Sequence, residues 1–90
     1  MQPALAIDGV PSARLLRTLA AIVELTNVLG RPPTYHRLSM RLSLYHRTVV
    51  RHVFRLQDIG LVQMATRPRR VLQPTARGRQ WLEWLERTNS

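Results

Sequence analysis

The residues that decide the fold are 31–62, which read RPPTYHRLSMRLSLYHRTVVRHVFRLQDIGLV. Two prolines interrupt any helix before them, and the Thr34 hydroxyl suits the N-terminal cap of a new helix over residues 35–41. A second helix is predicted over residues 46–59, because apolar residues recur there at i, i+4 and i+7 until Gly60 ends it. The positions that predict its buried face are Val49, Val53 and Leu56. The stretch therefore predicts two consecutive helices joined by a tight connection without glycine.

The sequence before this stretch predicts a longer helix and a short arm. Ser12 suits a helix cap, and apolar residues recur with the helical period over residues 13–29, where Gly30 predicts the end. Residues 1–11 contain two prolines and a glycine and are interpreted as an extended N-terminal arm. The apolar anchors of this arm are Leu5, Ile7 and Val10. We therefore expect an arm at 1–11 and a single domain at 12–90.

The sequence after it predicts a hairpin and a last helix. Residues 61–65 and 70–73 are typical of strands, and residues 66–69 between them, which include two arginines, predict the basic tip of a β-hairpin. Thr75 then suits the cap of a helix over residues 76–88. The predicted fold class is mainly α with a small β-hairpin, in the order α-α-α-β-β-α.

Composition argues against several classes of function. The 90 residues leave room for one domain, and 44% hydrophobic residues predict a modest core. The chain has no cysteine, no metal-ligand spacing around its three histidines and only scattered acidic residues, so we expect no metal site, no cofactor and no enzyme. No apolar run approaches the roughly 20 residues that span a bilayer, and no signal peptide is evident. We expect a cytoplasmic protein of a prokaryote, phage or plasmid that does not bind membranes.

Arginine dominates the charge of the chain. There are 14 arginines, no lysine and five acidic residues, for a formal net charge of +9. Residues 31–79 hold eleven of the arginines against Asp58 alone, whereas the charges of residues 1–30 cancel. A GC-rich genome explains arginine in place of lysine, but it does not explain the shortage of acids in this region. A localised positive charge of this size predicts a polyanionic partner.

Several short motifs, in their order and spacing, resemble those of winged helix-turn-helix transcription regulators. They are Gly30-Arg31-Pro32-Pro33-Thr34-Tyr35, Thr48-Val49, Leu56, Gly60-Leu61-Val62 and Pro74-Thr75-Ala76-Arg77-Gly78-Arg79. The first is similar to the start of helix two in LexA-type repressors, and the last to the segment after the wing in MarR-type repressors. The long flanking helices of MarR-type proteins and the Ser/Lys pair of the LexA-type protease domain have no counterpart here. The resemblance therefore implies a DNA-binding module, with no small-molecule effector pocket and no protease.

The resemblance and the charge together predict where duplex DNA binds. In a helix-turn-helix the second helix enters the major groove, where an exposed guanidinium can pair bidentately with guanine. The residues expected at DNA on this helix are Tyr45, His46, Arg47, Val50, Arg51 and Arg55. Those expected at the start of the preceding helix are Thr34, Tyr35, His36 and Arg37. Those expected on the wing, at the flanking backbone or minor groove, are Arg67, Arg69 and Arg70.

A homodimer is expected, because paired half-sites raise the specificity of a small module. The candidate interface comprises Leu5, Ile7 and Val10 of the arm with Trp81 and Trp84 of the last helix. Two interpretations of the tryptophans stay open, because they can complete a small core or form an interface, where tryptophan is enriched. In the second case, Leu82 and Leu85 pack on the domain instead.

The leading interpretation is a small transcriptional regulator, a repressor, that binds double-stranded DNA in a sequence-specific manner. The alternatives are a replication or partition protein, an architectural DNA-binding protein with little base preference, and a winged-helix protein-interaction module. RNA binding has no aromatic stacking platform to support it. Single residues also keep structural interpretations, with His36 and His52 partly buried and Tyr35 packed beside its helix. For Phe54 a core or dimer contact is expected rather than base stacking.

Overall fold

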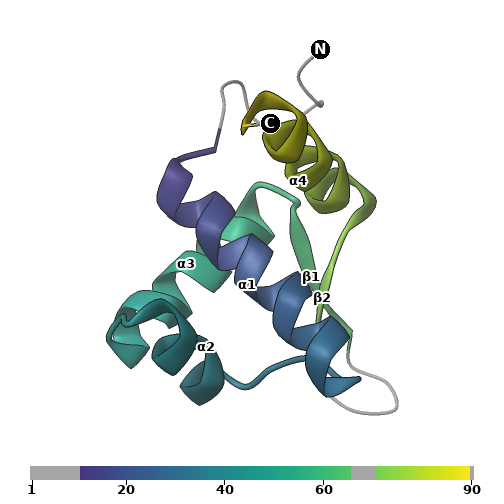
Figure 1. The fold of residues 1–90 in the computed structure, drawn as a ribbon. Coiled ribbons are helices and arrows are strands. Elements are labelled where there is room, and N and C mark those ends of the chain that lie inside the picture. The colour runs from purple at the N-terminus through teal and green to yellow at the C-terminus, as the bar shows by residue number, and fades with distance from the viewer. Residues whose placement is uncertain (1–10, 66–70, 90) are drawn as a thin grey trace.

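The computed structural model describes residues 11–65 and 71–89. Its helices are α1 (Ala13–Leu29), α2 (Tyr35–Leu42), α3 (His46–Asp58) and α4 (Ala76–Asn89), and its strands are β1 (Val62–Ala65) and β2 (Val71–Pro74) (Figure 1). Each bound lies within one residue of its prediction. The chain is mainly helical with a small antiparallel hairpin, which confirms the coarse fold class expected from the sequence. No helix among the described residues is both long and apolar enough to cross a membrane.

The helix ends follow the predicted local chemistry. The Ser12 hydroxyl accepts a hydrogen bond from the Leu15 N–H at 3.3 Å, and the Thr34 hydroxyl accepts one from the Arg37 N–H at 3.2 Å. Gly30 adopts the left-handed conformation at φ 72° and closes α1. These caps satisfy backbone groups that a helix end leaves without a partner, so the bounds of α1 and α2 are set locally.

The tight connection between α2 and α3 is held by Ser39. Its hydroxyl donates to the Leu44 carbonyl oxygen at 2.6 Å, and the Leu44 N–H donates to the Ser39 carbonyl at 3.1 Å. Ser43 takes the left-handed conformation at φ 55°, although glycine is the usual residue there. This connection orients α3 against α2 without a glycine.

Helix α1 is the centre of the packing, because it contacts the other three helices and strand β2. Figure 1 shows α1 between the α2–α3 pair on one side and the hairpin with α4 on the other. The buried core comprises Leu16, Leu19, Ala21, Ile22, Leu38, Val49, Val53, Leu56, Ile59, Leu61, Val62, Leu72 and Trp81. All the structured elements contribute to this one core.

Trp81 decides between the two interpretations of α4. Its side chain is only 1% exposed and packs edge-to-face on Trp84, with ring centroids 5.1 Å apart. An interface role for Trp81 is therefore wrong, because the residue is inside the folded chain. Trp84, Leu82 and Leu85 are half-buried against the same core. The leucines and the tryptophans of α4 thus pack on the same core, rather than on two separate surfaces.

Hydrogen bonds of Thr75 connect the residues after α3 to the first turn of α4. Its hydroxyl donates to the Gly60 carbonyl at 2.6 Å and accepts from the Gly78 N–H at 3.1 Å, which confirms the predicted cap. Its own N–H donates to the Leu61 carbonyl at 3.0 Å. The strands pair with Met64 opposite Leu72, and β1 contacts α3.

Candidate nucleic-acid interface

Helix α3 has one buried face and one exposed basic row. Three core residues of α3 are fully buried, as predicted, and these are Val49, Val53 and Leu56. On the far side of the helix, Arg47, Arg51 and Arg55 are all exposed and follow one another at intervals of four residues, so they form a row along the helix. None of the three makes an ion pair or a side-chain hydrogen bond with any residue that the structure describes. Their guanidinium groups are therefore free to bind an anionic partner.

A second row lies beside the arginines on the same exposed side. It comprises His46, Val50 and Phe54, again at intervals of four residues. Phe54 is 54% exposed, and Val50 is half-buried. His46 is exposed, and its ring contacts the edge of the Tyr35 ring, with centroids 5.8 Å apart. The core contact considered for Phe54 is wrong. Its position relative to Val50 and His46 is the signal that could have revealed its exposure from the sequence.

The N-terminus of α3 has no side-chain cap. Tyr45 occupies the cap position with no side-chain hydrogen bond to the helix, and its side chain is 84% exposed. The first amide N–H groups of an α-helix have no partner within the helix, and they suit an anionic oxygen. Tyr45, His46 and Arg47 thus surround an end of α3 that is suited to a phosphate.

The start of α2 lies near the apolar row of α3. Thr34 serves as the cap, so its hydroxyl already accepts one hydrogen bond. His36 and Arg37 are exposed, whereas Tyr35 is half-buried and turned toward α3, where it meets His46. Of the four residues predicted here, His36 and Arg37 have exposed side chains that can reach a partner. Thr34 caps α2, and Tyr35 packs against His46.

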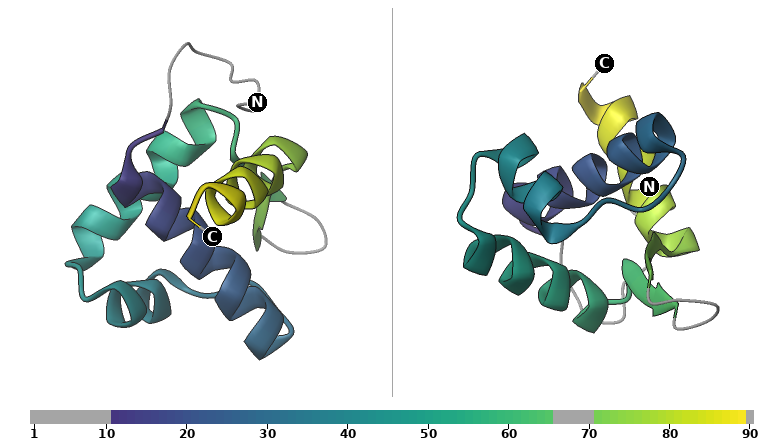
Figure 2. Two further views of the ribbon diagram at one scale, coloured as in Figure 1. Left: turned by 45° about the horizontal axis from the view of Figure 1, so that its top comes forward. Right: turned by 90° about the horizontal axis from the view of Figure 1, so that it is seen from below.

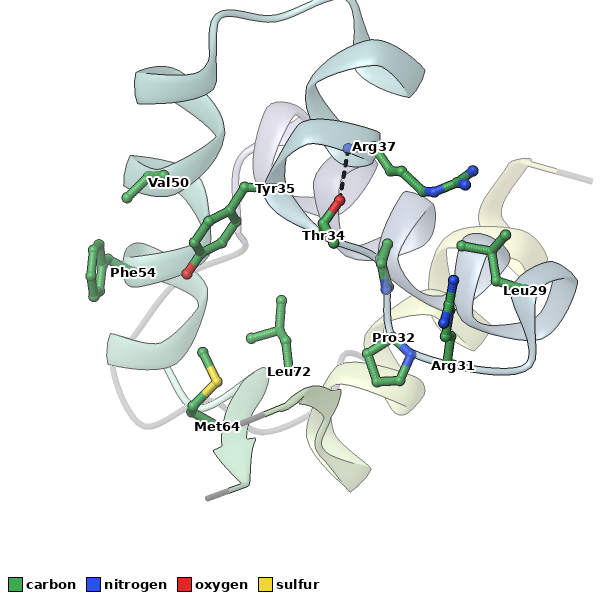
Figure 3. Close-up of a pocket in the computed structure, with 11 residues that line it drawn as sticks. Leu29, Arg31, Pro32, Thr34, Tyr35, Arg37, Val50, Phe54, Met64 and Leu72 are labelled. Carbon is green, nitrogen blue, oxygen red and sulfur yellow. Dashed lines mark hydrogen bonds between the residues drawn. The ribbon is translucent and has the colours of Figure 1, made fainter. Parts of the chain in front are cut away.

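An open groove of about 830 Å³ separates α3 from the end of α1 and borders the hairpin (Figure 3). Val50 and Phe54 form one side, Met64 and Leu72 of the hairpin form the base, and Tyr35 lies between them. The remaining lining residues are Leu29, Arg31, Pro32, Pro33, Thr34 and Arg37. No acidic residue is among the lining residues of this groove. The groove is therefore apolar at its base and positively charged at its rim.

His52 lies on the side of α3 that faces α1. Its Nδ1 is 3.1 Å from the hydroxyl oxygen of Thr18, which is fully buried and donates its own proton to the Arg14 carbonyl at 3.1 Å. With the hydroxyl proton on the Arg14 carbonyl, the Nδ1–H tautomer of His52 donates to the Thr18 oxygen. Burial first, and then the positive charges of Arg51 and Arg14, lower the pKa of His52 below its ordinary value. This geometry agrees with the structural role expected for His52.

Arg41 is the arginine of this region that is already paired. Its guanidinium nitrogen Nη2 lies 2.9 Å and 3.0 Å from the two carboxylate oxygens of Glu24, so α2 is tied to α1. This ion pair joins residues 17 positions apart, and nothing in the local sequence indicates it. Arg41 therefore differs from the arginines of α3, which make no ion pair with any described residue.

Comparison with known proteins adds no relative to this picture. No protein-family model matches the chain, and neither the curated proteins nor the solved structures contain a match. The residues themselves therefore carry the functional argument.

Several predicted site residues lie outside the described part of the chain. These are the wing arginines Arg67, Arg69 and Arg70 and the arm residues Leu5, Ile7 and Val10. Within the described ranges, the predicted residues Thr34, Tyr35, Arg37 and Val50 line one groove beside the hairpin, and His46 contacts Tyr35. Sequence reasoning did not find the groove, because it forms only where α1, α2, α3 and the hairpin come together.

Proposed function

We propose that this chain is a winged helix-turn-helix protein that binds double-stranded DNA in a sequence-specific manner and acts as a small transcriptional regulator, a repressor. The observation that carries the proposal is the exposed row of Arg47, Arg51 and Arg55 on the second of two consecutive helices. None of the three arginines makes an ion pair with a described residue. An exposed row of unpaired cations of this kind suits a polyanion.

The arrangement supports major-groove binding in particular. An α-helix fits the major groove, and in a helix-turn-helix the N-terminal residues of the second helix contact base edges. Arg47 and Arg51 lie in the first two turns of α3, so their guanidinium groups suit the O6 and N7 acceptors of guanine. Arg55 lies one turn further along and suits the phosphate backbone. His36 and Arg37 suit the phosphates beside it.

The loop of the hairpin supplies the wing in this proposal. In chain order, Arg67, Arg69 and Arg70 belong to the segment between β1 and β2, and β1 is the first element after α3. Arginine is favoured in narrow minor grooves, where the negative potential is enhanced. Base contacts by α3 and flanking contacts by the wing would together define one half-site, and a homodimer would bind two of them.

Selection of bound fragments from a random duplex library tests the proposal. The full chain is incubated with the library at about 0.15 M salt, close to physiological ionic strength. An enriched palindromic motif containing guanine is the expected result. The spacing of its two halves gives the distance between the DNA-binding surfaces of the dimer. Binding without enrichment would make the protein architectural. No binding would favour a protein-interaction module and would overturn the proposal.

Arg47→Ala tests the assignment of α3. Loss of a bidentate contact to guanine is expected to weaken binding to the selected motif by about 1–3 kcal/mol and to relax the preference at one base position. The measurement is a titration of labelled duplexes that carry each base at each position. Arg87→Ala is the charge-matched control, because Arg87 lies in the last turn of α4. Figure 2 shows that end of α4 on the opposite side of the molecule from α3. Equal effects of the two variants on the motif would contradict the assignment.

A further inference from the structure

The proposed contacts of the α3 arginines with DNA assign no role to Val50 and Phe54, the apolar residues beside them. Phe54 is 54% exposed, and Val50 at i−4 is half-buried beside it. Residues at i, i+1, i+4, i+5 and i+8 share one side of a helix, so Phe54 lies on the same side as Arg47 and Arg51. Any surface that meets these two arginines therefore meets Phe54 as well.

We propose that Phe54, with Val50, contacts the C5-methyl group of a thymine in the major groove, next to the guanine that Arg47 or Arg51 binds. This inference rests on the proposed function and adds a second, apolar element to it. In the major groove the thymine methyl is the apolar group of the base edges, and phenylalanine and other apolar side chains contact it. The basic row and the apolar row of α3 would thus read two kinds of base edge side by side.

Charge decides the occupant of this surface in favour of DNA over a second copy of the chain. Arg31 and Arg37 line the groove next to Phe54, Arg47 and Arg51 flank it on α3, and no acidic residue lines the groove. A two-fold dimer through this face would place the same arginines of both copies against each other. Like charges brought together at an interface are costly, whereas DNA phosphates attract them. Asp58, the acidic residue of α3, is exposed one turn beyond Phe54 at the C-terminal end of the helix, and it does not line the groove.

The test uses DNA with and without the thymine methyl group. Two random duplex libraries are amplified from one pool, one with thymidine and the other with deoxyuridine, which lacks only the C5-methyl group. The wild-type chain is expected to enrich a fixed thymine beside guanine in the first library and to lose that preference in the second. On a single selected duplex, replacing this thymine by deoxyuridine should weaken binding about fourfold, the fold-change that corresponds to burial of one methyl group.

In Phe54→Ala, the ratio of the affinities for the thymidine and deoxyuridine duplexes should fall to about one. The guanine positions should stay enriched in both libraries. Met40→Ala is the matched control, because Met40 is also a large exposed apolar residue but lies on α2, outside the groove. It should leave the ratio unchanged.

The outcomes separate this inference from the proposed function. If the wild-type chain binds neither library, the proposed function fails. If it enriches guanine but binds thymidine and deoxyuridine duplexes equally, the thymine contact is overturned while the proposed function stands. A ratio that Phe54→Ala leaves unchanged also overturns the contact. So does a change of sedimentation behaviour in Phe54→Ala without a change of the ratio, because Phe54 would then be a dimer contact.

Discussion

Val53 and Phe54 are neighbours in the chain but lie on different faces of α3. Val53 is fully buried against the core, whereas Phe54 is 54% exposed beside the groove. A rotation of about 100° per residue separates them, and this rotation alone assigns each side chain of α3 to the core or to the surface. At the scale of single residues, the role of a side chain on this helix follows from its position in the helical period.

His52 gives the protein a predictable response to pH. The pKa of His52 is lowered in the folded chain by burial and by Arg51 and Arg14, so the unfolded chain binds the proton more tightly. The free energy of unfolding is therefore expected to be highest above the unfolded pKa of about 6.5 and to decrease as the pH falls below it. Urea unfolding at a series of values from about pH 7.5 to about pH 5 measures the effect.

His52→Gln is the variant that isolates this effect. Glutamine keeps a side-chain donor near the Thr18 hydroxyl but does not titrate. The decrease in stability below about pH 6.5 should become shallower in His52→Gln. It should be unchanged in the control His36→Gln, because His36 is exposed on α2. An unaltered pH profile in His52→Gln would show that the titration of His52 does not contribute.

At the scale of elements, α4 is positioned by a close approach of its first turn to Leu61, the residue before β1. A Cβ atom on Gly78 would collide with the Leu61 carbonyl oxygen and lie 3.5 Å from Leu19 Cδ1. The same Leu61 carbonyl accepts a hydrogen bond from the Thr75 N–H, so it is not free to move away. The glycine is therefore required by packing rather than by an unusual φ angle.

Gly78→Ala tests this requirement. Alanine is favoured over glycine in helices by about 1 kcal/mol, so an unobstructed site would be stabilised. The collision with the backbone is expected to reverse the sign and to destabilise the fold by about 1–3 kcal/mol. Thermal and urea unfolding measure the difference. Gln80→Ala, an exposed position on the same helix, should change stability by less than about 0.5 kcal/mol. A Gly78→Ala protein as stable as the wild type would disprove the close approach.

At the scale of the whole molecule, the distribution of charge matters more than the total. Eleven of the 14 arginines fall in residues 31–79, and those of α2 and α3 are all exposed. Arg41 is paired with Glu24, so Arg37, Arg47, Arg51 and Arg55 remain as cations without an ion pair among the described residues of α2 and α3. A surface of this kind should bind DNA with a marked dependence on salt.

The salt dependence is expected to be steep, with log K decreasing against log salt concentration at a slope of about −3 to −6 for one protomer. The measurement is fluorescence anisotropy of a labelled random-sequence duplex from about 0.05 to about 0.3 M salt. Arg55→Ala should make the slope about one unit shallower, since this residue is assigned to a phosphate. The Met40→Ala variant should keep the wild-type slope. A slope near zero would mean that these arginines do not contact the DNA backbone.

The sequence by itself determined the features that depend on near neighbours in the chain. The caps at Ser12, Thr34 and Thr75 are examples, because a cap joins residues three apart, and so is the buried face of α3, because the helical period is short. The basic surface of α3 follows from the same period. These interactions form within an element whatever lies around it, so a pattern in one dimension is enough to predict them.

Only the tertiary structure decided which faces meet. The four apolar residues at 81, 82, 84 and 85 cover so wide an arc of α4 that periodicity leaves the choice open, and the packing against the core selected Trp81 as its buried member. The contact of His52 with Thr18 joins residues 34 positions apart. The groove beside Phe54 is bounded by three helices and both strands of the hairpin. Such contacts depend on which elements cover a face, and a periodic pattern shows that a face is apolar without showing what will cover it.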